Sequence, residues 1–369
     1  NNWVAAVGLV LAISDFLLRR GYYLRLKEML EDLHKCQMPF HERGIISRLL
    51  ADTNVRLGEY EIARSLAAVA ASTADAEGVL EERRLDSIAA RQIEAKCELE
   101  LGRVANAIVI LDSSLLELRS THQEHRSMDP KLAEVMLRVL VDLAFANSVV
   151  GEVELAIELS KEAELLASSI KNIHWRIVVV AYQGLYYSYL GEMAKARETY
   201  LKAISLGRDQ NERFPLALVY GLLSELDLIT EQGNAVDFAL RALEMEQDIR
   251  KNAVTGSWCH WLIALALARN SDRIANAKDH AEEALKFNRP LNNPNPRALL
   301  GIVCLRLGQR ENGVKILEEV IRETDKLVRS CDRNWEVLYA KGWALLGLAS
   351  CGYAALYEAI EVYELARLA

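Results

Sequence analysis

Apolar residues recur at helical spacing along almost the whole chain. In the stretch SWCHWLIALALARN at 257–270, Trp258, Trp261, Leu262 and Leu265 follow the i, i+3, i+4, i+7 rule, which is the pattern of one buried helix face. No segment keeps the sustained alternation of apolar and polar residues that marks a half-buried strand. The pattern therefore predicts an all-α protein.

Turn residues divide this helical pattern into units. Each follows an apolar helical stretch and precedes an amphipathic one, at intervals of 37 to 49 residues. Glycine at such a place ends a helix in a left-handed conformation, and asparagine tolerates that conformation best after glycine. The turn positions are Gly21, Gly58, Gly102, Gly151, Gly191, Gly233, Asn270, Gly308 and Gly352. They predict about nine helical hairpins, which must stack on one another because a single hairpin cannot bury its own apolar faces.

Two further patterns support this register. A small residue stands about five positions into the second helix of several hairpins, as at Ala63, Ala107, Ala156 and Ala196, where it lets two helices approach closely. The six prolines all fall between predicted hairpins, which is informative because a proline inside a helix costs roughly 3 kcal/mol.

The best-formed hairpin carries the signature of a known repeat. The stretch VAYQGLYYSYLGEMAKARETYLKA has Gly184, Tyr187, Gly191, Ala196, Tyr200 and Ala203 at the spacing of the tetratricopeptide repeat family. The chain resembles that family over nearly its whole length. The resemblance implies a right-handed superhelix, or α-solenoid, in which the first helix of each hairpin lines a concave wall. It says little about function, because one fold hosts many activities.

The long intervals and the opening FLLRRGYYLRLKEMLEDL at 16–33 are similar to a narrower group. They resemble the C-terminal sensor regions of STAND-type signalling NTPases and of maltose-activator-like regulators. That resemblance implies a sensor that recognises an inducer or a partner. We therefore expect 1–369 to be a single repeat domain, subdivided if at all near 119–131 and 288–298, and to be a piece of a longer protein.

Composition narrows the range of partners and compartments. The net charge of −8 repels phosphate backbones, so nucleic-acid binding is disfavoured. The six cysteines form no CxxC pair and are typical of reduced thiols in a cytoplasmic protein. The apolar stretch 3–13 is too short to span a bilayer and is expected to form a buried first helix, so no membrane partner is expected.

Motifs for chemistry are missing from the sequence. It holds no phosphate-binding GxxxxGK[ST] loop, GxSxG elbow, HExxH helix or GxGxxG turn, so neither catalysis nor a cofactor is expected. His122 and His125 have metal-compatible spacing but lack the further ligands that a site needs. Cys259 and His260 are adjacent and point about 100° apart on a helix, so they are not expected to share a metal ion.

The family register predicts which side chains face the concave wall. These residues are mostly polar, with both charges and several aromatic rings, and they differ from a uniformly basic clamp. The predicted wall residues are Arg48, Asp52, Gln92, Lys96, Arg138, Phe145, Ser148, Ser188, Tyr189, Tyr220, Asp227, Thr230 and Arg269.

Two aromatic groups have two interpretations each. Trp175, Tyr182 and Tyr186 share one helix face and are expected to pack in the core, with a recognition patch as the sharper alternative. Trp258 and Trp261 are likewise expected to pack in the core. The alternative is a partial pocket, with Cys259 and Arg269 reaching the concave wall.

The favoured function is a non-catalytic recognition superhelix. It would bind a protein, a peptide or a small-molecule inducer as the sensor of a multidomain signalling protein. The alternative is a free-standing scaffold that joins proteins in an assembly. An RNA-binding repeat protein and an enzyme come last, since the chain is acidic and has no repeated two-residue code and no catalytic constellation.

Overall fold

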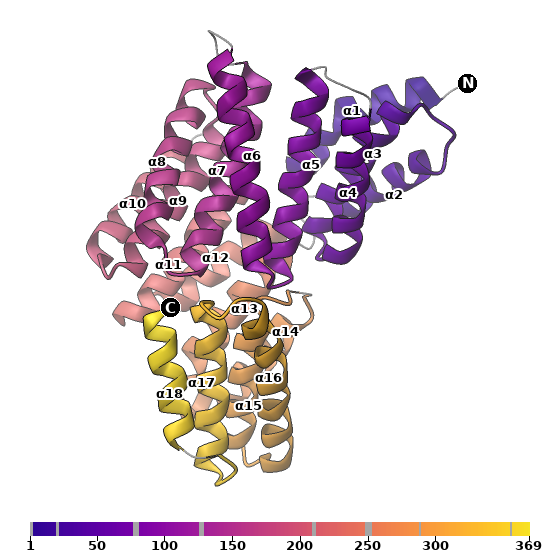
Figure 1. Ribbon diagram of the computed structural model, residues 1–369. Coiled ribbons are helices and arrows are strands. Elements are labelled where there is room, and N and C mark those ends of the chain that lie inside the picture. The colour runs from indigo at the N-terminus through magenta and orange to yellow at the C-terminus, as the bar shows by residue number, and fades with distance from the viewer. Residues whose placement is uncertain are drawn as a thin grey trace.

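The computed structural model describes residues 3–19, 22–76, 81–124, 129–208, 212–247, 253–287, 289–354 and 356–369. In these ranges the chain forms α-helices and one short 3₁₀ helix, η1 (Ser271–Arg273), and no strand (Figure 1). The helices are α1 (Trp3–Arg19), α2 (Tyr23–His34), α3 (Phe40–Arg56), α4 (Tyr60–Ala76), α5 (Glu81–Glu100), α6 (Val104–Glu124), α7 (Pro130–Val149), α8 (Val153–Ser169), α9 (Ile173–Tyr189), α10 (Met193–Gly207), α11 (Arg213–Thr230), α12 (Ala235–Gln247), α13 (Ala253–Ala268), α14 (Ile274–Leu285), α15 (Pro294–Arg306), α16 (Arg310–Ser330), α17 (Trp335–Ser350) and α18 (Leu356–Leu368).

Consecutive helices pack as hairpins, from α1 with α2 to α17 with α18. From α3 onward, each odd-numbered helix also contacts the next odd-numbered helix, so the first helices of the hairpins form the inner layer of the stack. The prediction of an all-α, right-handed superhelix of nine tetratricopeptide-like hairpins is confirmed (Figure 1).

The turn glycines adopt the conformation that the sequence predicts. From Gly58 to Gly352, all seven have φ between 75° and 84°, the left-handed region in which a side chain is strained. Gly21 lies outside the described residues. The prediction for Asn270 is wrong: its φ is −106°, and its side chain instead accepts a hydrogen bond from the backbone N–H of Asp272 at the start of η1. Asparagine here caps the next helix rather than ending the previous one.

Small residues let the paired helices approach closely, as predicted. Ala63, Ala107, Ala156 and Ala196 are all fully buried. In the α9–α10 hairpin, a Cβ placed on Gly184 would overlap the ring of Tyr200, which is itself buried. The ring of Tyr200 therefore occupies the space that a side chain at Gly184 would need.

This close packing predicts opposite effects for two glycine substitutions. Gly184→Ala is expected to lower the free energy of unfolding by about 1–2 kcal/mol, because overpacking against Tyr200 outweighs the helix-propensity gain. Gly8→Ala in α1 is the matched control, since nothing lies within 4 Å of its Cβ position, and it should stabilise by about 0.5 kcal/mol. Denaturation by urea measures both. Two substitutions with the same sign would contradict the packing.

The superhelix folds back on itself. The segment between α16 and α17 meets the turns that follow α5 and α7: Ser330 donates a hydrogen bond to the Gly102 carbonyl (2.9 Å), and the Trp335 indole N–H donates to the Ser148 carbonyl (3.1 Å). Arg333 pairs with Glu152 across the same junction (2.9 Å). Figure 1 shows the C-terminal helices α13–α18 lying against the lower ends of the earlier helices.

A buried ion pair reinforces this closure. The guanidinium of Arg289, between α14 and α15, lies 3.1 Å from the carboxylate of Glu100 at the end of α5, and both side chains are 7% exposed. The backbone N–H of Leu291 also donates to the Glu100 carbonyl (3.0 Å). Residues nearly 200 positions apart are thus joined in the interior.

Several local expectations need correction or qualification. The first helix is not buried all round: Val7 and Val10 are buried, whereas Val4 and Leu9 are about 60% exposed. The segment at 119–131 is also not simply a connection, because α6 continues through Glu124. The proposed subdivisions at 119–131 and 288–298 stay predictions.

None of the six cysteines, all of which lie within the described ranges, forms a disulfide bond. Within the part of the chain that the structure describes, no helix is long and apolar enough to cross a membrane.

Candidate ligand cavity

The inner layer encloses a cavity of about 300 Å³. Its wall consists of side chains from the first helices α7, α9, α11, α13, α15 and α17, from Arg269 just after α13, and from the connection between α14 and α15. The lining residues are Phe145, Tyr182, Leu185, Tyr189, Leu218, Leu222, Glu225, Leu228, Ile229, Ser257, Trp258, Trp261, Leu262, Leu265, Arg269, Arg289, Asn292, Asn295, Pro296, Trp335, Glu336, Tyr339 and Trp343. Among these, Ile229, Arg269 and Tyr339 are the exposed ones and mark the opening.

Aromatic rings dominate the wall. The rings of Tyr189 and Trp335 meet edge to face at 5.0 Å between centroids, and Trp335 meets Tyr339 in the same way at 6.0 Å. Four of the six tryptophans of the chain line the cavity. Such rings offer a large apolar surface that is already held in place by its neighbours.

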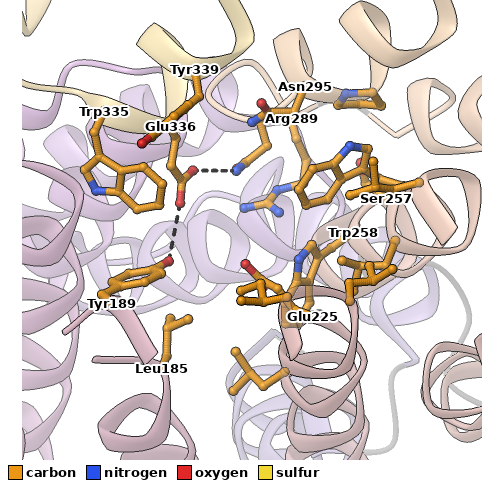
Figure 2. A pocket seen from close by; sticks show the side chains of 18 of the residues that line it. Leu185, Tyr189, Glu225, Ser257, Trp258, Arg289, Asn295, Trp335, Glu336 and Tyr339 are labelled. Carbon is orange, nitrogen blue, oxygen red and sulfur yellow. Dashed lines mark hydrogen bonds between the residues drawn. The ribbon is translucent and has the colours of Figure 1, made fainter. Parts of the chain in front are cut away.

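Two carboxyl groups enter the cavity from different helices (Figure 2). Glu336 of α17 accepts hydrogen bonds from the Tyr189 hydroxyl (3.5 Å) and from the side-chain amide of Asn292 (3.2 Å). Glu225 of α11 lies on the other side, next to Trp258, whose side chain donates a hydrogen bond to it. A predominantly apolar pocket with a few converging polar groups is the usual form of a small-ligand site.

Burial disfavours the charge on both carboxyl groups. It is the main reason why the pKa of Glu225 is raised to about 8, and the nearby charge of Glu336 adds to the effect. The pKa of Glu336 is raised as well, again by burial, although the charge of Arg289 opposes the rise. Near neutral pH, Glu225 therefore holds a proton that an exposed glutamate would have lost.

This raised pKa predicts how stability depends on pH. Between about pH 4.5 and pH 8 the unfolded chain ionises Glu225 while the folded chain keeps it protonated, so stability falls as the pH rises through this window. Glu225→Gln should remove this fall. Relative to the wild type, we expect the variant to become about 3 kcal/mol more stable as the pH rises from 5 to 8. Urea titrations at the two pH values measure this difference, and Glu154→Gln, at an exposed position of α8, is the control. If both variants behaved alike, the assignment to Glu225 would be contradicted.

Three of the predicted wall residues line the cavity: Phe145, Tyr189 and Arg269. Arg269 lies at the opening, where its guanidinium donates to the Leu228 carbonyl (3.0 Å) and lies 3.8 Å from the carboxylate of Glu231. Its side chain is therefore anchored to the end of α11.

Five other predicted wall residues lie together on the earlier first helices α3, α5 and α7. They take part in a network of charged and amide groups, with Arg48 near Asp86 (3.9 Å), Asp52 near Arg56 (3.9 Å) and Lys96 near Asp142 (4.0 Å). The five are Arg48, Asp52, Gln92, Lys96 and Arg138. Gln92 donates to Asp142, and Arg138 pairs with Glu134 (2.8 Å). These five side chains have charged partners of their own and lie outside the cavity.

The remaining five do not reach the cavity. Ser148, Ser188 and Thr230 each donate a hydroxyl hydrogen bond to their own helix backbone.

Asp227 and Tyr220 are directed towards second helices: Asp227 is buried beside Arg197 of α10, and Tyr220 stacks on Phe238 of α12. Since positions 225 and 227 lie about 200° apart around a helix, only one of them can face the cavity. The register placed Asp227 there, whereas the structure places Glu225.

The tryptophan pair of α13 is part of the cavity wall rather than only of the core. Trp258 and Trp261 line the cavity, whereas Cys259 is fully buried on another face of α13. The Nδ1 atom of His260 lies 3.0 Å from the Nδ1 atom of His280, away from Cys259 in the core.

In the aromatic group of α9, Tyr186 is fully buried, as expected of core packing, while Tyr182 lines the cavity. Within the described residues, no three potential metal ligands gather in one place, and His125 lies outside them.

Comparisons with known proteins support the fold. No protein-family model and no curated protein sequence matches the chain. Among solved structures, the Rap conjugation gene regulator of plasmid pLS20, in complex with a Phr peptide, is 12% identical; the match covers 99% of this chain and 94% of that one, with a TM-score of 0.60. A Rap protein complexed with competence and sporulation factor is 10% identical, over 88% of this chain and 99% of that one, with a TM-score of 0.58. The chain thus has the fold of tetratricopeptide-like repeat proteins.

A STAND protein with a tetratricopeptide repeat sensor from Pyrococcus horikoshii is also similar. It is 15% identical, and the match covers 94% of this chain and 55% of that one, with a TM-score of 0.49. This chain therefore spans about half the length of that protein. The STAND-type assignment stays a prediction.

Proposed function

We propose that this superhelix is a non-catalytic sensor that binds a small molecule, or the side chains of a short peptide, in the central cavity. The observation that carries the proposal is the cavity itself, which is lined by side chains of six hairpins, with aromatic rings from four of them, and holds two buried carboxyl groups. Its volume of about 300 Å³ lies at the lower end of small-ligand sites. It suits an inducer better than it suits a folded partner.

In such a sensor, ligand binding would change how often the superhelix is closed. The cavity wall contains Tyr189 and Phe145 from the middle of the chain and Trp335 and Tyr339 from α17. A ligand that contacts both groups binds the closed form better than any open form. It therefore shifts the population towards closure by its difference in affinity for the two forms. Other domains of the same signalling protein would respond to that shift.

Similar folds support a peptide as one form of the ligand. One of the two Rap proteins has a solved structure with a Phr peptide, and the other has one with competence and sporulation factor. In this chain, a peptide would place one or two side chains in the cavity and leave its backbone over the opening. Asp86 and Asp142, with their partners Arg48 and Lys96, lie on the same inner layer and would contact the rest of an extended peptide.

Ligand capture tests the proposal. The purified chain is incubated with a metabolite and peptide extract, and native mass spectrometry then records what is retained. The matched variant is Asn295→Trp, which fills the cavity from the first turn of α15, where Asn295 is only half-buried. We expect the wild type to retain a ligand and Asn295→Trp to lose it. Equal retention by both would contradict a ligand in this cavity.

A further inference from the structure

The charges around the cavity do not balance among its own residues. Among the lining residues that the structure describes, the cations are Arg269 and Arg289. Arg269 is held at the opening by the Leu228 carbonyl and Glu231. Arg289 is bonded to Glu100, which lies behind the wall. In and behind this wall, three carboxyl groups, Glu100, Glu225 and Glu336, thus accompany one interior guanidinium.

The two carboxyl groups that face the cavity are arranged to receive a donor. Glu336 is oriented by hydrogen bonds from Tyr189 and Asn292, and Glu225 by one from Trp258. Each carboxylate has about four acceptor positions, and these contacts use only some of them. The remaining oxygen lone pairs are available to a ligand that donates hydrogen bonds.

The neighbouring rings fit a positively charged ligand with an apolar body. Trp258 contacts Glu225, and Trp335 adjoins Glu336 in sequence and packs against Tyr189. The negative faces of tryptophan and tyrosine rings attract cations, more strongly when water is excluded. The surrounding leucines of α9, α11 and α13 provide apolar surface for the rest of the molecule.

We infer that the cavity recognises the cationic group of its ligand, an ammonium or guanidinium on an apolar body, between Glu225 and Glu336. This inference rests on the proposed function, since it names the chemical class of the ligand. The raised pKa of Glu225 favours its protonated form near neutral pH, and a bound cation would neutralise the carboxylate in place of that proton. An anionic ligand would instead add a further negative charge to a buried site that already has an excess.

Matched probes test the inference directly. The probes are 2-phenylethylamine, tryptamine and hexylamine, each compared with the alcohol and the carboxylic acid of the same carbon skeleton. Thermal unfolding and titration calorimetry are recorded at pH 7.5. We expect at least one amine to raise the Tm and to bind at least tenfold more tightly than its alcohol, and we expect the acids not to bind.

Conservative variants show whether the two carboxyl groups cause the preference. Glu225→Gln and Glu336→Gln, each made alone, should reduce the amine's affinity to that of the alcohol. The affinity for the alcohol should stay unchanged, which also shows that the variant is folded. Glu154→Gln, on the exposed surface of α8, should behave like the wild type. An amine that binds both glutamine variants as well as the wild type would overturn the inference.

The remaining outcomes separate this inference from the proposed function. An alcohol or acid that binds as tightly as its amine, and is lost in Asn295→Trp, overturns the cation class but supports a ligand in the cavity. The absence of binding by every amine also overturns the cation class. The capture experiment with the extract then decides the sensor function independently.

Discussion

Replacing Arg289 by methionine is expected to lower the free energy of unfolding by about 3–5 kcal/mol. The guanidinium lies in the interior, 3.1 Å from Glu100, with both side chains 7% exposed. Methionine fills most of the same volume but leaves the Glu100 carboxylate buried without its cation, which is more costly than losing both charges together. Urea denaturation at neutral pH measures the change.

Two controls show whether burial is the cause. The double variant Glu100→Gln/Arg289→Met should recover much of the loss, because no buried charge is then left uncompensated. Arg333→Met removes a pair that bridges the same two parts of the superhelix, but Arg333 and Glu152 are each about half exposed. Its cost should stay below about 1 kcal/mol. If Arg333→Met and Arg289→Met were equally costly, the closure would not depend on the interior pair.

Replacing Trp335 by alanine is expected to cost about 3 kcal/mol and to open the superhelix. The indole packs against Tyr189 and Tyr339, and its N–H donates to the Ser148 carbonyl at the turn after α7. Its removal takes away both apolar contact and a hydrogen bond at the closing junction. Unfolding by urea gives the cost, and an increase in the radius of gyration by small-angle X-ray scattering reports the opening.

Two comparison variants isolate the part that closure plays. Trp335→Phe keeps an aromatic ring next to Tyr189 but has no N–H for Ser148, so it should cost about 1 kcal/mol and leave the radius of gyration unchanged. Tyr357→Ala changes an aromatic residue of α18 that is 62% exposed, and it should have little effect on either measurement. A Trp335→Ala protein with the wild-type radius of gyration would contradict the role of Trp335 in closure.

The helical architecture could be read from the sequence because local rules determine it. The glycine turns impose a left-handed φ, and the pairing of Gly184 with Tyr200 follows the spacing of one hairpin. These contacts lie within about 40 residues along the chain. Asn270 is the exception, since asparagine suits both a helix end and a helix start, and the sequence does not show which of the two it forms.

The cavity depends on contacts that no local pattern contains. Glu100 and Arg289 are 189 positions apart in the sequence, and Trp335 and Ser148 are 187 positions apart. These contacts follow from the cumulative rotation of nine hairpins, to which each irregular interval contributes. Glu336 and Arg289 therefore had no signal in the sequence that marked them as neighbours. Glu225 had a weak signal in the sequence, because it is an acidic residue within the apolar stretch of α11.

The repeat register predicted which side chains lie on the concave wall. Of the residues it assigned to the concave wall, Phe145, Tyr189 and Arg269 line the cavity, on or just after α7, α9 and α13. On α11 the same register selected Asp227 instead of Glu225. A helix rotates by about 100° per residue, so an error of two positions moves a side chain from the inner face to the second-helix layer.

A crystal structure with the tightest-binding amine of the matched series tests the central claim most directly. We expect the amine inside the cavity between α11 and α17, with its nitrogen within hydrogen-bond distance of Glu225 or Glu336 and its apolar part against Trp258 or Trp335. The junction between Trp335 and Ser148 should be intact. An amine bound elsewhere on the protein, with the cavity empty, would contradict the account.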